Sequence, residues 1–222
     1  INGLMDSFVG PARFKRPLGE HRPMLAETVE AVGATAANLI NDGAWVTQPK
    51  LDGERLIIEV REGQVVAYNR QGQPKARNFG EAILAPFRHL TSGRWVFDGE
   101  IVGRKFWVFD MTNADDRLPF DASFTDRHAA LTKIMDVLVP LAPESLGLIG
   151  YAATAADKRA MLDDSIDSSK EGVMFRLASS KYEPGRRSRN LLKLKHIKTA
   201  DVVVTAQVHG KQSVEMGLYD DN

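Results

Sequence analysis

Gln48-Pro49-Lys50-Leu51-Asp52-Gly53-Glu54-Arg55 joins two β-like runs of sequence, 44–47 and 55–60. Pro49 fixes the backbone just before Lys50, and Gly53 permits a tight turn that a Cβ would hinder. If the stretch is extended, Lys50 and Asp52 point to the same side of it. A lysine pinned between strands can act as a nucleophile once its surroundings let it lose a proton. Taken alone, the stretch is equally typical of a surface hairpin, so its meaning depends on the rest of the chain.

The composition bounds the class of protein. The 222 residues, 43% of them hydrophobic, suffice for one large domain or two small ones with a buried core. Lysine plus arginine and aspartate plus glutamate both number 29, so bulk charge does not argue for nucleic acid, although a local basic face remains open. The absence of cysteine excludes disulfides, thiolate zinc sites and cysteine nucleophiles, and it fits a reducing compartment.

Targeting signals are not visible in the chain. No apolar run approaches the roughly 20 residues of a membrane span, and no signal peptide is present. We therefore expect no membrane partner and a cytoplasmic location. Because the chain begins at Ile1 rather than Met, we expect a trimmed product.

Hydrophobic periodicity predicts an α+β fold with antiparallel β-sheets and flanking helices. Alternating or β-branched runs predict strands at 44–47, 55–60, 64–68, 94–102, 105–111, 146–152, 172–177, 191–197 and 202–208. Apolar residues at helical spacing predict helices at 28–40, 79–90, 123–138 and 154–162. There is no G-x-G-x-x-G and no P-loop, so any nucleotide must be held in another way.

Two predicted strands carry residues that need an explanation. Asp98 and Glu100 share a face of an apolar strand, and a half-buried carboxylate needs hydrogen-bonding or cationic partners. An edge strand with its polar face in water would explain them equally well. Phe109 closes the aromatic run 106–109, where it could stack on a planar ligand or simply pack in the core.

Charged residues near the C-terminal end of the chain form a second group. Glu171 precedes a predicted strand, where it could bind magnesium or be an ordinary loop glutamate. Lys193 and Lys195 lie on one face of a strand, and two adjacent ammonium groups repel each other unless an anion such as phosphate lies between them. The alternative is an edge strand on which lysines guard against aggregation.

Together and in this order, these stretches resemble the covalent nucleotidyltransferases, specifically the ATP-dependent DNA ligases. Arg22-Pro23-Met24-Leu25-Ala26 also looks like the segment that precedes the lysine in many DNA ligases. The resemblance spans roughly residues 22–208. It rests on K-x-D-G-x-R at Lys50, Asp52, Gly53 and Arg55, D-G-E at 98–100, F-D at Phe109 and Asp110, E-G at Glu171 and Gly172, and K-x-K at Lys193 and Lys195.

The resemblance implies a division of the chain and a set of roles. Residues 1–22 would be an irregular arm, 23–200 an ATP-grasp-like adenylation domain, and 201–222 the incomplete beginning of an OB-fold. Lys50 would attack the α-phosphate of ATP and form a lysyl-AMP adduct. For the base, Phe109 would stack on adenine and Gln48 would read the adenine edge. Arg55 and Glu100 would hold the ribose and phosphate region, and Arg70 would contact AMP or the nicked strand.

The remaining roles concern charge: Glu171 and Glu100 would hold Mg²⁺ or Mn²⁺, and Lys193 and Lys195 would neutralise the α-phosphate.

The resemblance also implies an acceptor and a subclass. AMP would pass to the 5′-phosphate of nicked double-stranded DNA, a 3′-hydroxyl would then seal the nick, and the enzyme would act as a monomer. The final basic element of the family, late in its OB-fold, is not present, so the first step from ATP is open for this chain. We expect a small ligase of bacterial or viral type, since an NAD-dependent ligase carries a cysteine zinc site.

Three alternatives to the DNA ligase remain open. An RNA ligase shares the lysine chemistry, and a capping enzyme uses GTP in the same way. A non-catalytic nucleic-acid-binding module could keep the fold without forming any covalent adduct. Binding to a polynucleotide would in each case weaken steeply with salt, because phosphate contacts release counterions.

Overall fold

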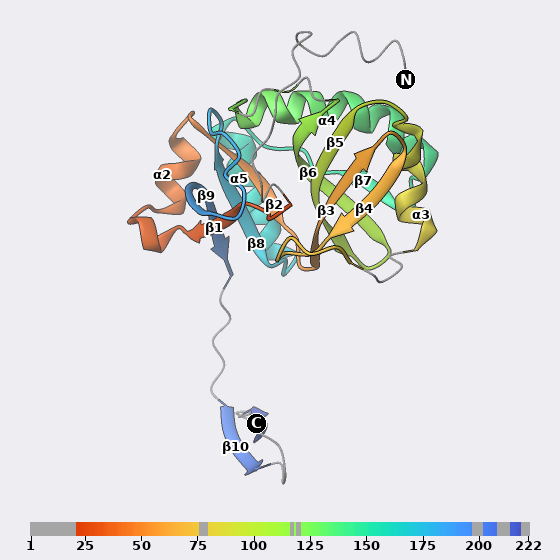
Figure 1. Cartoon of the computed structure of the whole chain (residues 1–222). Coiled ribbons are helices and arrows are strands. Elements are labelled where there is room, and N and C mark those ends of the chain that lie inside the picture. Colours follow the sequence, from red (N-terminus) through yellow and green to blue (C-terminus); the bar gives the residue numbers. More distant parts are fainter. Residues whose placement is uncertain are drawn as a thin grey trace.

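The computed structural model describes residues 21–75, 80–115, 118, 121–196, 202–207 and 214–218. Two β-sheets lie side by side and helices cover them (Figure 1). Most strand pairs in both sheets are antiparallel, which confirms the predicted α+β class. The predicted N-terminal arm falls almost entirely outside the described residues.

The first sheet combines segments from both ends of the described domain. Its strand order is β1 (Leu25–Thr28), β9 (Arg187–Lys195), β8 (Gly172–Leu177) and β2 (Trp45–Lys50). The outer strand β1 runs parallel to β9, whereas the other neighbours are antiparallel. The strand that Glu171 directly precedes, β8, therefore lies between β9, which carries the lysine pair, and β2, which ends at Lys50.

The second sheet is built from one continuous part of the chain. Its order is β4 (Gln64–Tyr68), β3 (Glu54–Arg61), β5 (Arg94–Val102), β6 (Lys105–Ala114) and β7 (Leu146–Leu148). Because β2 belongs to the first sheet and β3 to the second, the short turn between them joins the sheets. A Cβ on Gly53 in this turn would lie 2.1 Å from the carbonyl oxygen of Ile101, so only glycine allows β5 to approach.

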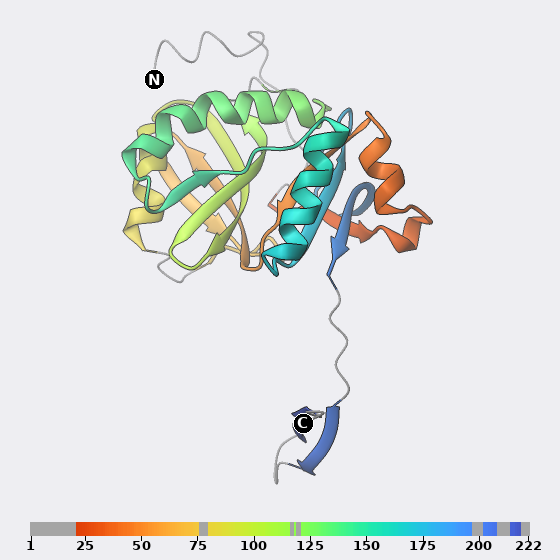
Figure 2. The ribbon, with the colours of Figure 1, turned by 180° about the vertical axis from the view of Figure 1, so that it is seen from behind.

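Helices pack on the outer faces of the sheets, as the rear view shows (Figure 2). Ser123 and Thr154 accept hydrogen bonds from the backbone at the starts of α4 and α5, which is the usual N-cap. α4 packs against β6 in the second sheet, and α5 packs against β2 and β8 in the first. The helical segments are η1 (Glu30–Val32), α2 (Ala36–Asn41), α3 (Glu81–Leu84), η2 (Ala85–His89), α4 (Phe124–Leu138), η3 (Val139–Leu141) and α5 (Ala155–Asp167).

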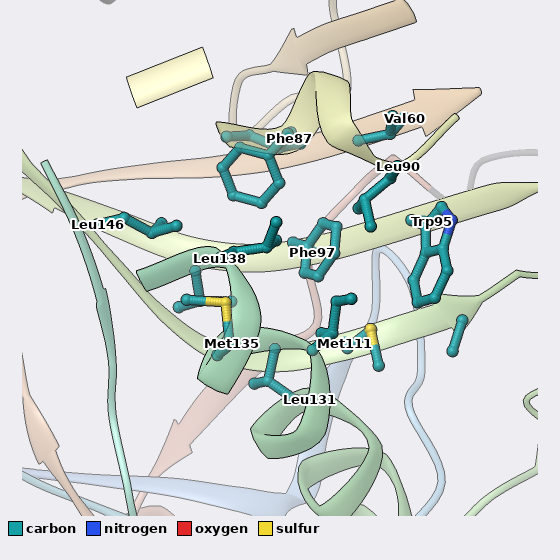
Figure 3. Packing of buried hydrophobic residues seen from close by; sticks show 14 of the residues in the cluster. Val60, Phe87, Leu90, Trp95, Phe97, Met111, Leu131, Met135, Leu138 and Leu146 are labelled. Carbon is teal, nitrogen blue, oxygen red and sulfur yellow. The ribbon is translucent and has the colours of Figure 1, made fainter. Parts of the chain in front are cut away.

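Each sheet has a hydrophobic core on its helix-covered side. In the second sheet, Leu56, Ile58 and Val60 alternate along β3 and point into the core, as a half-buried strand requires. Figure 3 shows side chains of α4 meeting Phe97 and Met111 there. The first sheet packs against α2 and α5 through a smaller cluster: Val29, Leu39, Ile40, Leu162, Val173, Phe175 and Leu192.

Several predicted boundaries were wrong. The helix predicted at 28–40 is interrupted, because Gly33 takes a left-handed conformation with φ of 69°, which separates the 3-10 helix η1 from α2. The strand predicted at 146–152 ends at Leu148, and Ala152 then makes an isolated bridge to Thr47. The helix predicted at 79–90 becomes a 3-10 helix at Ala85, since Pro86 cannot donate a backbone hydrogen bond.

The remaining elements agree with the predictions to within a few residues, but two strands, β1 and Val214–Leu218, were not predicted. The C-terminal segments β10 (Val202–Gln207) and β11 (Val214–Leu218) form a separate two-stranded antiparallel sheet. The expectation that they begin an OB-fold stays a prediction. Within the described residues, no helix is long and apolar enough to cross a membrane.

Candidate active site between the two sheets

A cavity of about 600 Å³ lies where the two sheets meet at the β2–β3 turn. The residues predicted from the sequence to form the site come from β2, β3, β5, β6 and β9 and from the segments that follow β4 and precede β8. The structure brings all nine of them into the wall of this cavity: Gln48, Lys50, Arg55, Arg70, Glu100, Phe109, Glu171, Lys193 and Lys195.

Lys50 lies at the end of β2 and pairs with Glu171. Its Nζ donates to Glu171 Oε2 and to the carbonyl oxygen of Leu51 at 3.3 Å. The other carboxylate oxygen of Glu171 lies 2.8 Å from Nζ of Lys195. Burial alone would raise the pKa of Glu171, but the hydrogen bonds and charges of Lys195 and Lys50 lower it below the ordinary value. Glu171 is therefore an ionised bridge between two ammonium groups.

The position directly after Glu171 accepts only glycine. Its φ is 146°, a conformation that side chains rarely adopt, and a Cβ there would lie 1.9 Å from the carbonyl oxygen of Leu194. Gly172 is directly opposite Lys195 on β9 and Lys50 on β2. The absence of a side chain thus lets three strands close around the charged end of the cavity.

Positive charge concentrates at this end of the cavity. Lys193 lies two residues from Lys195 on β9, and both line the cavity. Burial lowers the pKa of Lys193, and the charges of Arg187, Lys195, Lys50 and Arg70 lower it further. These cations repel one another, so an anion with several negative oxygens, such as a polyphosphate, would relieve the repulsion.

Arg55 points into the cavity from β3 and is held by a buried carboxylate. Its Nε and one terminal nitrogen each lie 2.6 Å from an oxygen of Asp98, which is fully buried. Burial opposes the charge on Arg55, but Asp98 raises its pKa above the ordinary value. Tyr182 donates to the same carboxylate at 2.5 Å, and burial together with Asp98 raises the pKa of the tyrosine. No local pattern in the sequence indicates Tyr182, which lies 84 residues from Asp98.

Glu100 takes a different partner from Asp98. Its Oε1 accepts a hydrogen bond of 2.9 Å from the backbone of Gly53. Burial raises its pKa, although Arg55 and that backbone hydrogen bond act in the opposite direction. Glu100 therefore fixes the turn beside Lys50 and presents its remaining oxygen at the cavity wall.

The opposite end of the cavity is suited to a planar group. Phe109 projects there from β6, and its ring centroid lies 4.6 Å from the guanidinium carbon of Arg55 and 5.6 Å from that of Arg176. Gln48 is buried nearby, and its Nε2 lies 3.4, 3.3 and 3.5 Å from the carbonyl oxygens of Phe109, Ile149 and Gly150. Because the amide nitrogen faces these three acceptors, the amide oxygen is the end left for a ligand.

Asp110, which follows Phe109, is part of a buried ion cluster. Arg127 on α4 binds both of its oxygens, at 2.9 and 3.0 Å, and Arg176 on β8 binds one at 2.7 Å. Burial would raise the pKa of Asp110, but the two arginines hold it below the ordinary value. The cluster connects the second sheet, its covering helix and the first sheet. Sequence reasoning found Asp110 but neither arginine.

Two carboxylates are available at the cavity for a divalent cation. Glu100 and Glu171 both line it, and their charges interact. No group of three or more histidine, aspartate or glutamate side chains could hold a metal within the described part of the chain. Magnesium commonly binds through one or two carboxylates, with substrate phosphates and water as the other ligands. The residues present therefore fit a metal that arrives with a phosphate ligand.

Known proteins resemble this chain over most of its length. The model of the family described as ATP dependent DNA ligase domain matches residues 23–106 and 103–195. A probable DNA ligase of Mycobacterium marinum is 30% identical over an alignment of 235 positions, which covers 92% of this chain and 43% of the relative. The multifunctional non-homologous end joining protein LigD of Mycobacterium bovis is 28% identical over 202 residues, covering 82% of this chain and 25% of the relative.

Solved structures share the fold. Mycobacterial DNA ligase D complexed with ATP and MES superposes with a TM-score of 0.69 at 25% identity, covering 91% of this chain and 69% of that one. Chlorella virus DNA ligase-adenylate superposes with a TM-score of 0.56 at 20% identity, covering 85% of this chain and 72% of that one. This chain spans only a quarter to less than half of the length of the two curated relatives. The family match covers both sheets and the cavity between them, and the chain therefore belongs to the ATP-dependent DNA ligase domain family.

Proposed function

We propose that this chain is the adenylation part of an ATP-dependent DNA ligase and that Lys50 is its nucleophile. The observation that carries the proposal is the arrangement of the cavity. Lys50 lies at its strongly cationic end, and Phe109 lies at the opposite end, where a planar group fits. A nucleotide fits this polarity if its phosphates lie near Lys193 and Lys195 and its base lies near Phe109. Family membership and the ATP-bound relative support the same reading.

The proposed first step forms a bond between Nζ of Lys50 and the α-phosphorus of ATP. Pyrophosphate leaves with the electrons of the broken P–O bond. The lysine ammonium group loses two of its three protons to solvent and keeps one N–H in the lysyl-AMP phosphoramidate. Transfer of this kind depends on positioning and on charge neutralisation more than on acid–base chemistry. Lys193 and Lys195 supply the neutralising charge at the cavity wall.

Glu171 has to exchange partners for this step to occur. In the structure its two oxygens bind Lys50 and Lys195. When phosphate enters, Lys195 can pair with the phosphate oxygens and Lys50 can turn toward phosphorus. Glu100 and Glu171 would then hold a magnesium or manganese ion, which would supply further charge neutralisation for the phosphates.

The proposed acceptor is a 5′-phosphate at a nick in double-stranded DNA. One of its oxygens attacks the phosphorus of the adduct, and the N–P bond breaks to return Lys50 to the amine. The 3′-hydroxyl then attacks the activated 5′-phosphate and expels AMP, which leaves a phosphodiester bond. The names of the relatives as DNA ligases favour DNA over RNA as the acceptor.

Intact-mass spectrometry tests the first step. The chain is incubated with ATP and magnesium, and we expect a mass increase of one AMP that is lost in Lys50→Ala and in Lys50→Arg. Lys181→Ala, at an exposed lysine that does not line the cavity, should keep the adduct. An adduct that persists in both Lys50 variants would refute the assignment of the nucleophile.

A second experiment tests the acceptor. The purified adduct is given nicked DNA or nicked RNA in the absence of free ATP, and loss of AMP from the protein is followed together with sealing of the strand. We expect release and sealing on DNA. Release only on RNA would identify an RNA ligase, and an adduct with GTP in preference to ATP would identify a capping-type enzyme.

A further inference from the structure

Tyr182 is a buried residue that reaches the cavity wall through one intermediate carboxylate. It lies on the segment between β8 and β9 and is 5% exposed. Its hydroxyl group donates to Oδ2 of Asp98 at 2.5 Å, and the same carboxylate binds two nitrogens of Arg55, each at 2.6 Å. Among the described residues, Arg55 lines the cavity and Tyr182 does not. A side chain that follows a strand of the first sheet therefore acts on a cavity residue of the second sheet.

Arg55 lies between the two ends of the cavity. Its guanidinium carbon is 4.6 Å from the ring centroid of Phe109 at one end. Its charge also acts on Glu100, which binds the turn beside Lys50 at the other end. The ribose of a nucleotide joins the base to the phosphates. A nucleotide with its phosphates at the cationic end therefore places its ribose at the level of Arg55.

Asp98 occupies one side of the guanidinium group and leaves the other side for a ligand. Nε and Nη2 of Arg55 bind the carboxylate as a fork, and Nη2 also lies 3.5 Å from the carbonyl oxygen of Met24. The remaining nitrogen, Nη1, has no hydrogen-bond partner within the described part of the chain. Because the guanidinium group and the carboxylate are both planar, the orientation of Asp98 sets the direction in which Nη1 points.

The carboxylate of Asp98 needs a restraint from outside its own side chain. The last torsion of an aspartate side chain has only broad minima, so it does not fix the carboxylate plane. The hydroxyl group of Tyr182 adds a third hydrogen bond to those from Arg55. Burial, together with the charge of Asp98, raises the pKa of Tyr182 well above its ordinary value. The hydroxyl group therefore keeps its proton and remains a donor.

Tyr182 is itself held in place by two other parts of the chain. Its hydroxyl oxygen accepts a hydrogen bond of 3.0 Å from the backbone nitrogen of Met24. The guanidinium carbon of Arg127 on α4 lies 5.6 Å from the ring centroid of Tyr182, and Nη1 of Arg127 donates to the carbonyl oxygen of Ser180 at 2.9 Å. The hydroxyl group is therefore directed at Asp98 before any nucleotide arrives.

We propose that Tyr182 is a positioning residue for nucleotide binding: through Asp98 it fixes the direction of Nη1 of Arg55, which donates to a hydroxyl group of the ribose of ATP. The inference rests on the proposed function, since it requires ATP to enter this cavity. It adds to that function a residue between β8 and β9 that controls a contact to the ribose without touching the nucleotide.

The test compares binding of ATP with binding of 2′,3′-dideoxy-ATP, which lacks both ribose hydroxyl groups. Equilibrium binding is measured in EDTA, so that no adduct forms, for the wild-type chain and for Tyr182→Phe, which keeps the ring and removes the hydroxyl group. Tyr68→Phe is the matched control, because the Tyr68 hydroxyl group donates at 3.1 Å to Glu59, which binds Arg94 away from the cavity. Circular dichroism checks that each variant is folded.

We expect the wild-type chain and Tyr68→Phe to bind ATP about ten-fold more tightly than 2′,3′-dideoxy-ATP, and Tyr182→Phe to bind the two about equally. A purely structural role of Tyr182 would weaken binding of both nucleotides alike and leave their ratio unchanged, and that result would overturn the inference. Equal binding of both nucleotides by the wild-type chain, a measurement that needs no variant to fold, would also overturn it and leave the proposed function intact. Failure of the wild-type chain to bind ATP and to form an adduct would instead refute the proposed function.

A double-mutant cycle tests whether Tyr182 acts through Arg55. Arg55→Lys keeps a positive charge for Asp98 but lacks the Nη1 donor. The two nucleotides should already bind about equally to this variant, and adding Tyr182→Phe should leave their ratio unchanged. If the second substitution changed the ratio further, Tyr182 would act by another route and the inference would be wrong.

Discussion

At the scale of the residue, Glu171 compensates the charges of two lysines at the cavity. It lies between Lys50 and Lys195, and it keeps two ammonium groups from facing each other without a counter-ion. Its carboxylate is ionised in the folded chain, because both lysines lower its pKa. The stability of the site therefore depends on pH through this residue.

Glu171→Gln should lower stability at neutral pH by about 1 kcal/mol, and the loss should shrink in acid. The folded-state pKa of Glu171 lies below its ordinary value of 4.5, so its contribution is present above that pH and is lost as the pH falls through the folded-state pKa. Urea unfolding of both proteins at pH 7 and pH 3.5 checks this. An equal difference at the two pH values would show that the charge of Glu171 has no such role.

Gln48→Leu should weaken ATP binding by about ten-fold while leaving GTP binding nearly unchanged. Leucine keeps much of the volume but removes the acceptor that faces the cavity and the donor that faces three carbonyl oxygens. Competition of the two nucleotides for the chain measures the ratio. Equal weakening of ATP and GTP would mean that Gln48 supports the cavity without reading the base.

At the scale of the element, Lys158 connects α5 to the end of α2 and the start of β2. It is 1% exposed, and its Nζ lies 3.1, 2.8 and 2.9 Å from the carbonyl oxygens of Leu39, Asp42 and Trp45. These include carbonyl groups that a helix leaves without partners at its C-terminal end. A buried ammonium group thus closes α2 and fixes the entry into the strand that carries Lys50.

Lys158→Met should destabilise the chain by about 3 kcal/mol, since three carbonyl oxygens lose their donor while the side-chain volume is kept. Urea unfolding measures the change, and Lys181→Met at an exposed lysine is the control. A loss no larger than that of the control would show that water satisfies the carbonyl groups equally well.

The elements themselves differ in how well the sequence predicts them. Apolar and β-branched runs predicted β3 and the β5–β6 pair, because these strands pack into a hydrophobic core. Such runs failed to predict β1, whose four residues form an edge strand beside β9, more than 150 residues further along the chain. A continuous helix at 28–40 was wrong, because the spacing of apolar residues does not indicate the change of backbone conformation at Gly33.

The residues of the candidate site also divide into those that a local sequence pattern predicts and those that depend on distant partners. Charged and aromatic residues in short recognisable patterns, such as Lys50 and Phe109, were predicted, and the structure places them all at one cavity. Arg176 and Tyr182 were missed because their partners lie 66 and 84 residues away in sequence. An arginine within an apolar strand has no local pattern that indicates which carboxylate it will meet.

At the scale of the whole molecule, the Asp110 cluster holds the two sheets together. It joins β6 of the second sheet to β8 of the first and to α4, and all three side chains are buried. Removing one member of a buried ion cluster leaves the others without compensation. The two sheets should therefore unfold as one unit in the intact chain.

Asp110→Asn should destabilise the chain by about 3–5 kcal/mol, because two buried arginines lose their counter-ion. Unfolding in urea, followed by circular dichroism and by tryptophan fluorescence, measures both the loss and the number of transitions. Asp136→Asn, at an exposed aspartate, is the control and should change stability little. A loss as small as that of the control would mean that the sheets are held together by other contacts.

The origin of the first sheet also affects the order in which the protein assembles on the ribosome. The second sheet uses only residues 54–148, so the emerging polypeptide can complete it early. The first sheet needs β1 and β2 from the beginning of the chain and β8 and β9 from near its end. β1 and β2 therefore remain without β8 and β9 during synthesis, and a nascent chain lacks the finished cavity until Lys195 has left the exit tunnel.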